Sequence, residues 1–126
     1  MNKKRVFVSF AMEDAIEKML FCGQSKNSQV PYEFVDMSVK KPWDSSWKTN
    51  CRSRIKGCHA MIVLISENTK KADGALWEIK CGKEEGLEML GIYIKKGNVD
   101  NRPFELWGTK CQKWTWDNIR QFIDSL

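Results

Sequence analysis

The sequence has few of the residues that metal and redox chemistry require. Its 126 residues include a single histidine, His59, and no two of its five cysteines have Cys-x-x-Cys spacing. A metal site needs several ligands brought together, so none is expected. Cys58 and His59 make a poor nucleophile pair, because side chains adjacent in sequence rarely converge. The thiols are expected to be reduced, in a cytoplasmic protein.

Other signatures are missing as well. The start, Met1-Asn-Lys-Lys-Arg5, leads at once into a strand-like run, so neither a signal peptide nor a membrane span is expected. No Gly-x-Gly-x-x-Gly or Gly-x-x-x-x-Gly-Lys-Ser/Thr motif follows that run, which argues against ordinary dehydrogenases and phosphate-loop enzymes. No repeat or linker interrupts the chain, and residues 1–126 are expected to form one domain.

The net charge does not identify the kind of molecule that the protein binds. A formal net charge of +5 favours anionic partners, but the basic residues are spread along the sequence. Their densest run, from Lys40 to Lys56, is better explained as a solvated helix face than as a nucleic-acid patch. A basic nucleic-acid binder is therefore the least favoured function.

Strand-like and helix-like segments alternate along the chain. Strands are expected at 5–10, 32–37, 60–66, 88–94 and 110–114, and helices at 12–23, 45–57, 73–86 and 116–126. The continuous apolar run at 60–66 is typical of a strand covered on both faces, and so of the centre of a parallel sheet. This alternation predicts an α/β, flavodoxin-like fold, with a doubly wound, mainly parallel five-stranded sheet flanked by helices.

Three residues are expected to mark helix ends. Gly23 is expected to end the first helix. Asp44 (or Ser45 or Ser46) and Asp73 are expected to cap the starts of the second and third.

Ligands of such sheets bind beyond the carboxyl ends of the strands. That edge gathers the candidate site residues, namely Ser9, Phe10, Asp36, the loop 38–43, Ser66 and the start of the helix that carries Glu78. Ser66 stands roughly where a response-regulator receiver domain has its phosphoacceptor aspartate. Receiver function is therefore not expected.

Glu78 is unusual because small residues surround it. At 3.6 residues per turn, its neighbours on the same helix face are Gly74, Ala75, Cys81 and Gly82. Either this stripe leaves the carboxylate open to a ligand, or it lets the helix lie close on the sheet with Glu78 solvated at the edge. The helix alone favours close packing; its position on the ligand edge favours an open carboxylate.

Several short motifs occur in a characteristic order. Arg5-Val-Phe-Val-Ser-Phe10 is followed by Glu13-Asp14, and Phe34-Val-Asp-Met-Ser38 precedes a loop that carries tryptophan. An apolar strand ends in Ser66, and then come Trp77-Glu-Ile, Lys83-Glu-Glu-Gly and Leu90-Gly-Ile-Tyr-Ile94. In this order and spacing, over most of its length, the chain resembles the TIR-like domains, and within them the ThsB-type proteins of bacterial Thoeris anti-phage systems.

The resemblance implies an enzyme, an NAD hydrolase or cyclase of the bacterial cytoplasm. Catalytic TIR domains cleave the nicotinamide–ribose bond with a glutamate on the helix after the third strand, which is Glu78 here. A carboxylate can stabilise the positive ribosyl centre that forms as nicotinamide leaves, so NAD is the substrate and no metal or cofactor is implied. Glu78 is expected to act ionised, and strong burial would count against it.

The same resemblance implies partners. The product would be an ADP-ribose-derived signal (cyclic, linear or conjugated) that activates a separate effector, and a phage-derived trigger and self-association would accompany activation. A membrane is not an expected partner. The rival hypothesis is a non-catalytic TIR-like interaction module that assembles with its own kind and leaves Glu78 merely exposed.

Polar residues at the edge are assigned looser roles. Ser9 and Ser38 are expected to donate hydrogen bonds to ribose or phosphate, and Lys40 or Lys41 to face the pyrophosphate. Asp36 either binds the substrate or holds its own loop through a turn.

The aromatic platform for the substrate has three candidates. Phe10 or Trp43 is expected to stack on nicotinamide or adenine, although Phe10 is equally explained as a core residue and Trp43 as a lid on the neighbouring helix. Many TIR domains have a tryptophan several residues before the glutamate, whereas Gly74 is four before it here. The adjacent Trp77 is the third candidate.

Overall fold

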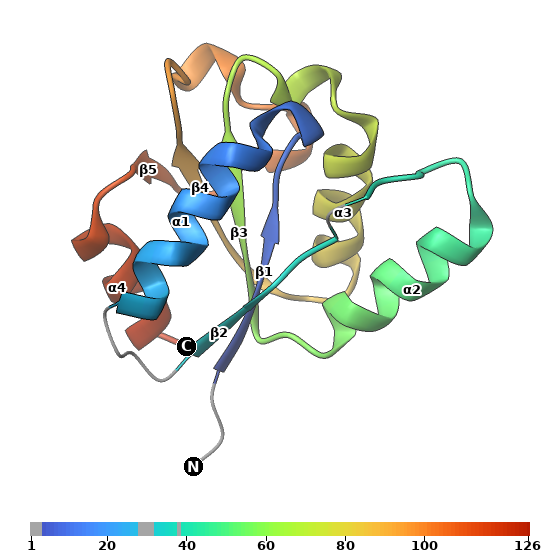
Figure 1. Ribbon diagram of the computed structural model, residues 1–126, viewed down its shortest axis with the longest axis horizontal. Helices are drawn as coiled ribbons and strands as arrows, with labels where there is room; N and C mark the ends of the chain where they lie inside the picture. Colours follow the sequence, from blue (N-terminus) through green and yellow to red (C-terminus); the bar gives the residue numbers. More distant parts are fainter. Residues whose placement is uncertain (1–3, 28–31, 38) are drawn as a thin grey trace.

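The computed structural model describes residues 4–27, 32–37 and 39–126 (Figure 1). Its strands are β1 (Lys4–Ser9), β2 (Tyr32–Val35), β3 (Ala60–Ile65), β4 (Glu88–Tyr93) and β5 (Cys111–Lys113), and its helices are α1 (Ala15–Asn27), α2 (Ser45–Lys56), α3 (Asp73–Glu84) and α4 (Trp116–Asp124). Short 3₁₀ turns are η1 (Met12–Asp14), η2 (Thr69–Lys71), η3 (Val99–Asn101) and η4 (Phe104–Leu106).

The five strands form one sheet in the order β2-β1-β3-β4-β5. Every pairing in it is parallel. β3 lies at the centre and all six of its residues are buried, as its continuous apolar run predicts. The predicted α/β, doubly wound, flavodoxin-like architecture is confirmed.

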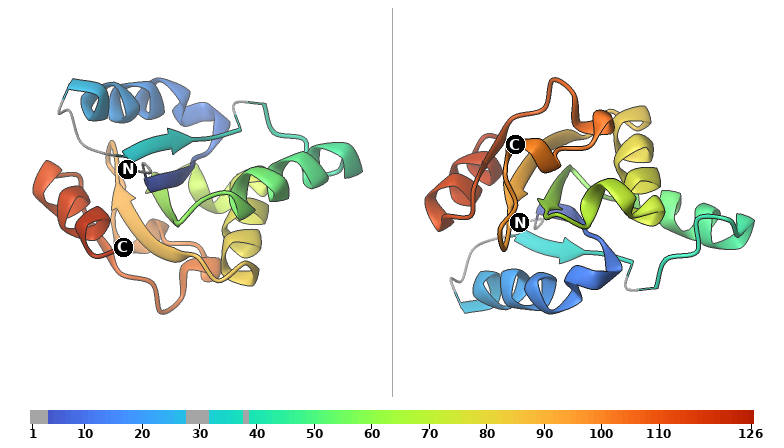
Figure 2. Two further views of the ribbon diagram at one scale, coloured as in Figure 1. Left: turned by 90° about the horizontal axis from the view of Figure 1, so that it is seen from below. Right: turned by 90° about the horizontal axis from the view of Figure 1, so that it is seen from above.

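Helices cover both faces of the sheet (Figures 1 and 2). Alternate residues of each strand point to opposite faces, so β3 supplies Ile62 and Leu64 to one core and Met61 and Val63 to the other. The first core is closed by α1 and α4, and the second by α2 and α3. Trp47, Cys51 and Ile55 form the inward face of α2 and are buried, as is Cys58 just after the helix.

Two of the three predicted helix ends are wrong. α1 continues past Gly23 to Asn27, because Gly23 lacks the positive φ that a terminating glycine uses. α3 begins at Asp73 itself, with Ala72 as the N-cap and no side-chain capping bond. The cap of α2 is confirmed, since the Asp44 carboxylate accepts a hydrogen bond of 2.9 Å from the Trp47 backbone N–H.

One helix carries an apolar face that the described residues do not cover. Met12, Ile16, Met19 and Leu20 on η1 and α1 are all exposed, and Ile16 is 71% exposed. Phe21 of α1 is fully buried in the core, and the partly buried Cys22 packs against it. None of the helices in the described part of the chain is long and apolar enough to cross a membrane.

Candidate functional site

Glu78 lies in the middle of α3 and has no contact with solvent. Its exposed fraction is 0%. The prediction of an approachable carboxylate is therefore wrong, and so is the alternative of a glutamate solvated at the edge of the sheet. Glu78 is expected to act ionised, so this burial counts against a catalytic role unless the carboxylate becomes accessible.

Three elements meet at the Glu78 carboxylate. The Ser9 hydroxyl, at the end of β1, donates a hydrogen bond of 2.8 Å to Oε1. The Lys40 ammonium, from the loop before α2, donates to Oε1 at 2.8 Å and to Oε2 at 2.9 Å. The Cys51 thiol of α2 lies 3.9 Å from Oε2. Both carboxylate oxygens are thus occupied by groups of the protein itself.

The small residues beside Glu78 make room for other side chains. A Cβ at Gly74 would lie 2.7 Å from the Lys40 Cβ. A Cβ at Gly82 would lie 2.6 Å from the terminal methyl groups of Met61 and Met89. Close packing, favoured by the helix alone, is therefore confirmed, and the stripe does not open Glu78 to a ribose in this structure.

Burial has the largest effect on the pKa of Glu78. Loss of hydration raises its pKa to about 7, and this outweighs the lowering of the pKa by the Lys40 ammonium and by the Ser9 hydroxyl. Burial, and then the nearby Glu78 carboxylate, also raises the pKa of the Cys51 thiol far above its usual range. Cys51 is thus a neutral thiol and not a nucleophile.

The raised pKa of Glu78 predicts how stability depends on pH. Between pH 4.5, the ordinary pKa of a glutamate, and about pH 7, folded Glu78 holds a proton that the unfolded chain has released. The free energy of unfolding is therefore expected to fall as pH rises through this window and to level off above it. Urea titrations at several pH values check this, with Glu78→Gln as the reference. Identical slopes for the two proteins would contradict the assignment.

Lys40 and Phe10 complete the site. The Lys40 ammonium lies 4.1 Å from the centroid of the Phe10 ring, and the Lys18 ammonium lies 5.3 Å from it. Phe10 is 1% exposed and packs in the sheet core, as its core interpretation predicts. Lys40 is itself buried and turned towards Glu78, so its predicted position facing a pyrophosphate is wrong in this arrangement.

Of the other predicted site residues that the structure describes, Asp36, Trp43 and Trp77 form no hydrogen bond or ion pair with the carboxylate. Asp36 pairs with Lys18 at 2.7 Å, and its nearby charge acts to raise the pKa of Glu78. Ser38 lies outside the described residues. Trp43 is 77% exposed, so the packed-lid interpretation is wrong. Trp77 packs edge-on against Trp47 with 5.4 Å between ring centroids, which joins α3 to α2.

A second polar cluster occupies the same edge of the sheet. The buried Asp14 carboxylate accepts hydrogen bonds from Ser66 Oγ at 2.5 Å, Asn68 Nδ2 at 2.9 Å and Lys95 Nζ at 2.8 Å. Lys95 also pairs with Glu17 at 3.2 Å. Sequence reasoning placed Ser66 at this edge but missed Asp14 and Lys95, although each follows the end of a strand. The Asp14 carboxylate and its three hydrogen-bond donors satisfy one another, which favours a structural role.

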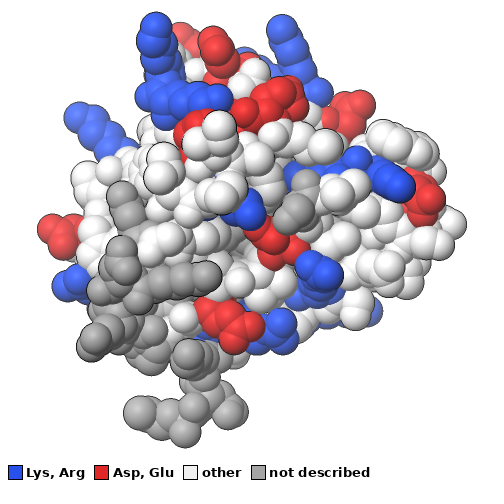
Figure 3. Space-filling view, viewed as in Figure 1, with Lys and Arg blue, Asp and Glu red and all other residues white. Residues whose placement is uncertain are grey.

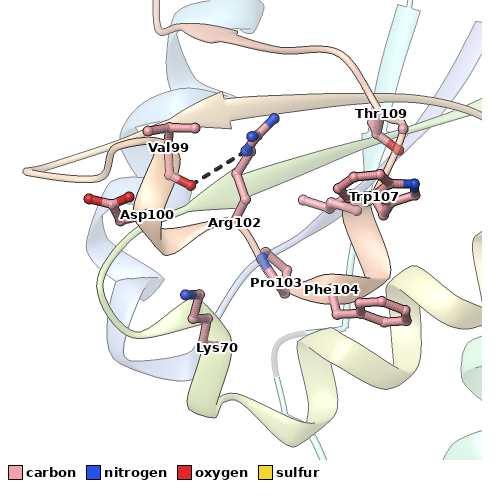
Figure 4. A pocket seen from close by; sticks show the side chains of 10 residues that line it. Lys70, Val99, Asp100, Arg102, Pro103, Phe104, Trp107 and Thr109 are labelled. Atoms are coloured by element: carbon pink, nitrogen blue, oxygen red, sulfur yellow. Dashed lines mark hydrogen bonds between the residues drawn. The ribbon is translucent and has the colours of Figure 1, made fainter.

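A hollow of about 670 Å³ lies away from Glu78 (Figure 4). Arg102, which donates to the Val99 carbonyl, lies within it, with Lys70 on one side and Trp107 on the other. None of the residues around Glu78 lines it. Another hollow, of about 520 Å³, lies between α2 and the loop that carries Lys40.

Charges on the visible face of the molecule are mixed. Figure 3 shows Lys and Arg side chains interspersed with Asp and Glu, without one continuous basic field. Among the described residues, no group of three or more His, Cys, Asp or Glu is placed to hold a metal ion. The candidate site is therefore the carboxylate of Glu78 and its neighbours.

Comparisons with known proteins give the same family as the motifs. A family model described as "Thoeris protein ThsB, TIR-like domain" matches residues 7–98, and so leaves β5 and α4 outside the match. A search of curated protein sequences finds no match.

Solved structures share the fold. The TIR domain of the Toll-related receptor TRR-2 from Hydra magnipapillata has a TM-score of 0.61 and 18% identity, over 95% of this chain and 91% of that one. The TIR domains of the activated Roq1 resistosome, which recognises the pathogen effector XopQ, have a TM-score of 0.53 and 14% identity, over 98% and 81%. Identities this low establish the fold alone. The match of the family model over residues 7–98 goes further, and the chain belongs to the family of Thoeris ThsB TIR-like domains.

Proposed function

We propose that this protein cleaves the bond between nicotinamide and ribose in NAD. The product is an ADP-ribose-derived signal, cyclic, linear or conjugated, that activates a separate effector in anti-phage defence. The observation that supports this proposal is the position of Glu78. It is an oriented carboxylate at the carboxyl edge of a parallel sheet, held by the Ser9 hydroxyl and paired with a cation.

Such a carboxylate suits the reaction. As the C1′–N1 bond breaks, its electron pair leaves with nicotinamide, which departs neutral, and positive charge develops on the ribosyl carbon. A carboxylate fixed in a site of low dielectric stabilises that charge without having to reorient. Water, or a hydroxyl or ring nitrogen of the substrate, then bonds to the same carbon, and any proton that it releases passes to solvent. The identity of that nucleophile determines the product.

Burial sets a condition on this activity. With Lys40 on both carboxylate oxygens, a ribose has no access to Glu78. The loop that carries Lys40 must therefore move before catalysis. We expect a phage-derived trigger, or self-association, to stabilise the arrangement in which Glu78 is accessible. A ligand or partner shifts a conformational equilibrium towards the state that it binds more tightly.

The test is nicotinamide release from NAD by the purified protein, with and without extract from phage-infected cells. Glu78→Gln keeps the size of the side chain but removes the negative charge, so release is expected to fall at least about a hundredfold. Nicotinamide is quantified by chromatography over time, in the presence of the extract that gives the highest rate with wild type.

The matched control is Glu84→Gln, on the same helix. Glu84 is exposed and pairs with Arg52 at 2.8 Å, so its loss is expected to leave the rate unchanged. Equal release by wild type and Glu78→Gln would rule out the assigned chemistry.

The second candidate is a non-catalytic module that binds a second copy of this chain. The exposed apolar face of Met12, Ile16, Met19 and Leu20 favours it, because contiguous apolar surface commonly marks an interface. The similar TIR domains of Roq1 belong to an activated resistosome, which is consistent with a TIR-like fold that works by assembly. The same assay distinguishes the two candidate functions. A non-catalytic module predicts no difference in nicotinamide release between wild type and Glu78→Gln.

A further inference from the structure

We propose that the hollow between η2 and the loop of residues 99–109 binds a nucleotide, a flat base that carries phosphate. This hollow of about 670 Å³ lies away from Glu78 (Figure 4). Apart from Lys70, the residues that line it follow residue 98, where the match to the family model ends. The site is therefore separate from the proposed cleavage of NAD and does not depend on it.

Two aromatic rings stand free at this hollow. Phe104 and Trp107 are 87% and 82% exposed, more than any other large apolar side chain among the described residues. The Trp107 backbone N–H donates a hydrogen bond of 2.9 Å to the Phe104 carbonyl, which closes the turn η4. Residues three apart in such a turn project from the same side. The two rings thus lie at the end of the hollow opposite Asp100 (Figure 4).

The backbone beneath the rings is fixed to the rest of the protein. Leu106, between the two aromatic residues, is buried in the core that α2 and α3 close, and Pro103 is buried as well. Lys83 of α3 donates a hydrogen bond of 3.2 Å to the Trp107 carbonyl. A ligand therefore meets a turn that is already ordered, so binding costs little backbone entropy. Exposed rings on an ordered backbone form a platform on which a base can stack.

Two cations border the same hollow. Lys70 and Arg102 are exposed, and no described carboxylate forms an ion pair with either of them. Arg102 is oriented by the hydrogen bond of 3.4 Å from its Nε to the Val99 carbonyl, which leaves its terminal nitrogens as donors. Burial raises the pKa of the Cys111 thiol, and the charge of the neighbouring Arg102 acts against this rise. A guanidinium held in this way matches the oxygens of a phosphate.

Asp100 narrows the choice of ligand. It is the acidic residue among those that line the hollow, at the end away from Trp107 (Figure 4). A carboxylate repels a bare anion, but it accepts hydrogen bonds from ribose hydroxyls or from an amino group of a base. Together with the cations and the rings, Asp100 favours a nucleotide over an inorganic anion.

A protein partner is the alternative occupant, because tryptophan and arginine often dominate protein interfaces. The shape of the site favours the nucleotide. Its volume of about 670 Å³ is within the range of roughly 300 to 1,000 Å³ that is typical of small-ligand sites. Lys70 and Trp107 lie on different sides of this volume, so one small ligand can contact both kinds of group (Figure 4).

The test measures the affinity of the protein for three probes by calorimetry. ADP has a base and phosphates, adenosine lacks phosphate, and ribose 5-phosphate lacks the base. ADP is expected to bind at least about tenfold more tightly than either of the other two. In a nitrogen-15 NMR spectrum, ADP is expected to shift the indole N–H signal of Trp107, which Trp107→Phe identifies.

Two variants separate the roles of the ring and the cation. Trp107→Ala is expected to weaken binding of ADP and adenosine at least about fivefold and to leave ribose 5-phosphate unchanged. Arg102→Ala is expected to weaken binding of ADP and ribose 5-phosphate by a similar factor and to leave adenosine unchanged. Both side chains are exposed, so both variants should fold.

Matched controls make the same chemical changes outside the hollow. Arg120→Ala removes an exposed arginine of α4, and Lys71→Ala removes the exposed neighbour of Lys70. Neither residue lines the hollow, and neither substitution should change the affinity for ADP, whereas Lys70→Ala should lower it.

The possible outcomes each decide the inference. Absence of ADP binding would overturn it, and so would ADP binding that Trp107→Ala and Arg102→Ala leave unchanged, which would place the ligand elsewhere. Tighter binding of a short single-stranded oligonucleotide than of ADP would overturn the assignment to a free nucleotide. Binding of ADP that both variants weaken, in a protein that releases no nicotinamide from NAD, would support the hollow and contradict the proposed function.

Discussion

Replacement of Asp14 by alanine should lower the free energy of unfolding by about 3 to 5 kcal/mol, a large part of the stability of a domain of this size. The reason is the number of groups that one buried carboxylate satisfies. Ser66, Asn68 and Lys95 all donate to it, and they belong to the loops that follow β3 and β4, whereas Asp14 itself follows β1. Alanine would leave the buried Ser66 hydroxyl without this acceptor and would separate the three loops.

Urea unfolding followed by tryptophan fluorescence measures this loss. The matched control is Glu17→Ala, which removes the other carboxylate that Lys95 contacts. Because the side chain of Lys95 is 37% exposed, that pair is partly solvated and its loss should cost less than about 1 kcal/mol. If Asp14→Ala and Glu17→Ala proved equally stable, the Asp14 carboxylate would not have the structural role assigned to it.

Replacement of Gly97 by alanine should cost about 3 kcal/mol or more, at the upper end of what an added methyl group costs in a packed region. A Cβ at residue 97 would lie 2.2 Å from the carbonyl oxygen of Ile65 and 2.9 Å from that of Ile94. Both are backbone atoms, and the Ile65 oxygen already accepts a hydrogen bond from Ile94 N–H. Neither atom can move without disturbing the ends of β3 and β4.

Gly23→Ala is the control with the same chemical change. Nothing lies within 4 Å of a Cβ at Gly23, which is inside α1, so alanine should raise helix stability by about 0.5 to 1 kcal/mol. Urea midpoints compared at one pH give both values. A Gly97→Ala protein as stable as wild type would show that the loop after β4 shifts more freely than its packing indicates.

Much of the fold could be predicted from the sequence because its signals are local. The apolar run of β3 requires cover on both faces, and the spacing of Trp47, Cys51 and Ile55 defines one side of a helix. Helix ends are harder to predict from the sequence, because a glycine ends a helix in this way only where its backbone adopts a positive φ. Gly23 does not do so, and α1 continues past it.

The candidate site could be predicted only in part. The rule that parallel strands place their carboxyl ends at one edge brought Ser9, Phe10 and Glu78 together, and the structure places them so. The rule says nothing about an irregular loop, so it could not place Lys40 over Gly74. A small-residue stripe indicates that something approaches closely, but it does not identify the approaching group. The burial of Glu78 was missed for this reason.

Lys4 and Leu126, at the two ends of the described chain, are in contact, because the Lys4 ammonium donates a hydrogen bond to the backbone carbonyl of Leu126. Lys4 begins β1, and Ser9, which binds Glu78, ends it. A strand of this length separates the two by roughly 17 Å. A surface tether, a fluorescent reporter or a fused protein attached at either end would therefore stand away from Glu78. A short linker that joins the ends would also give a circular permutant, in which new ends can be placed within the loop of residues 39–44 that carries Lys40.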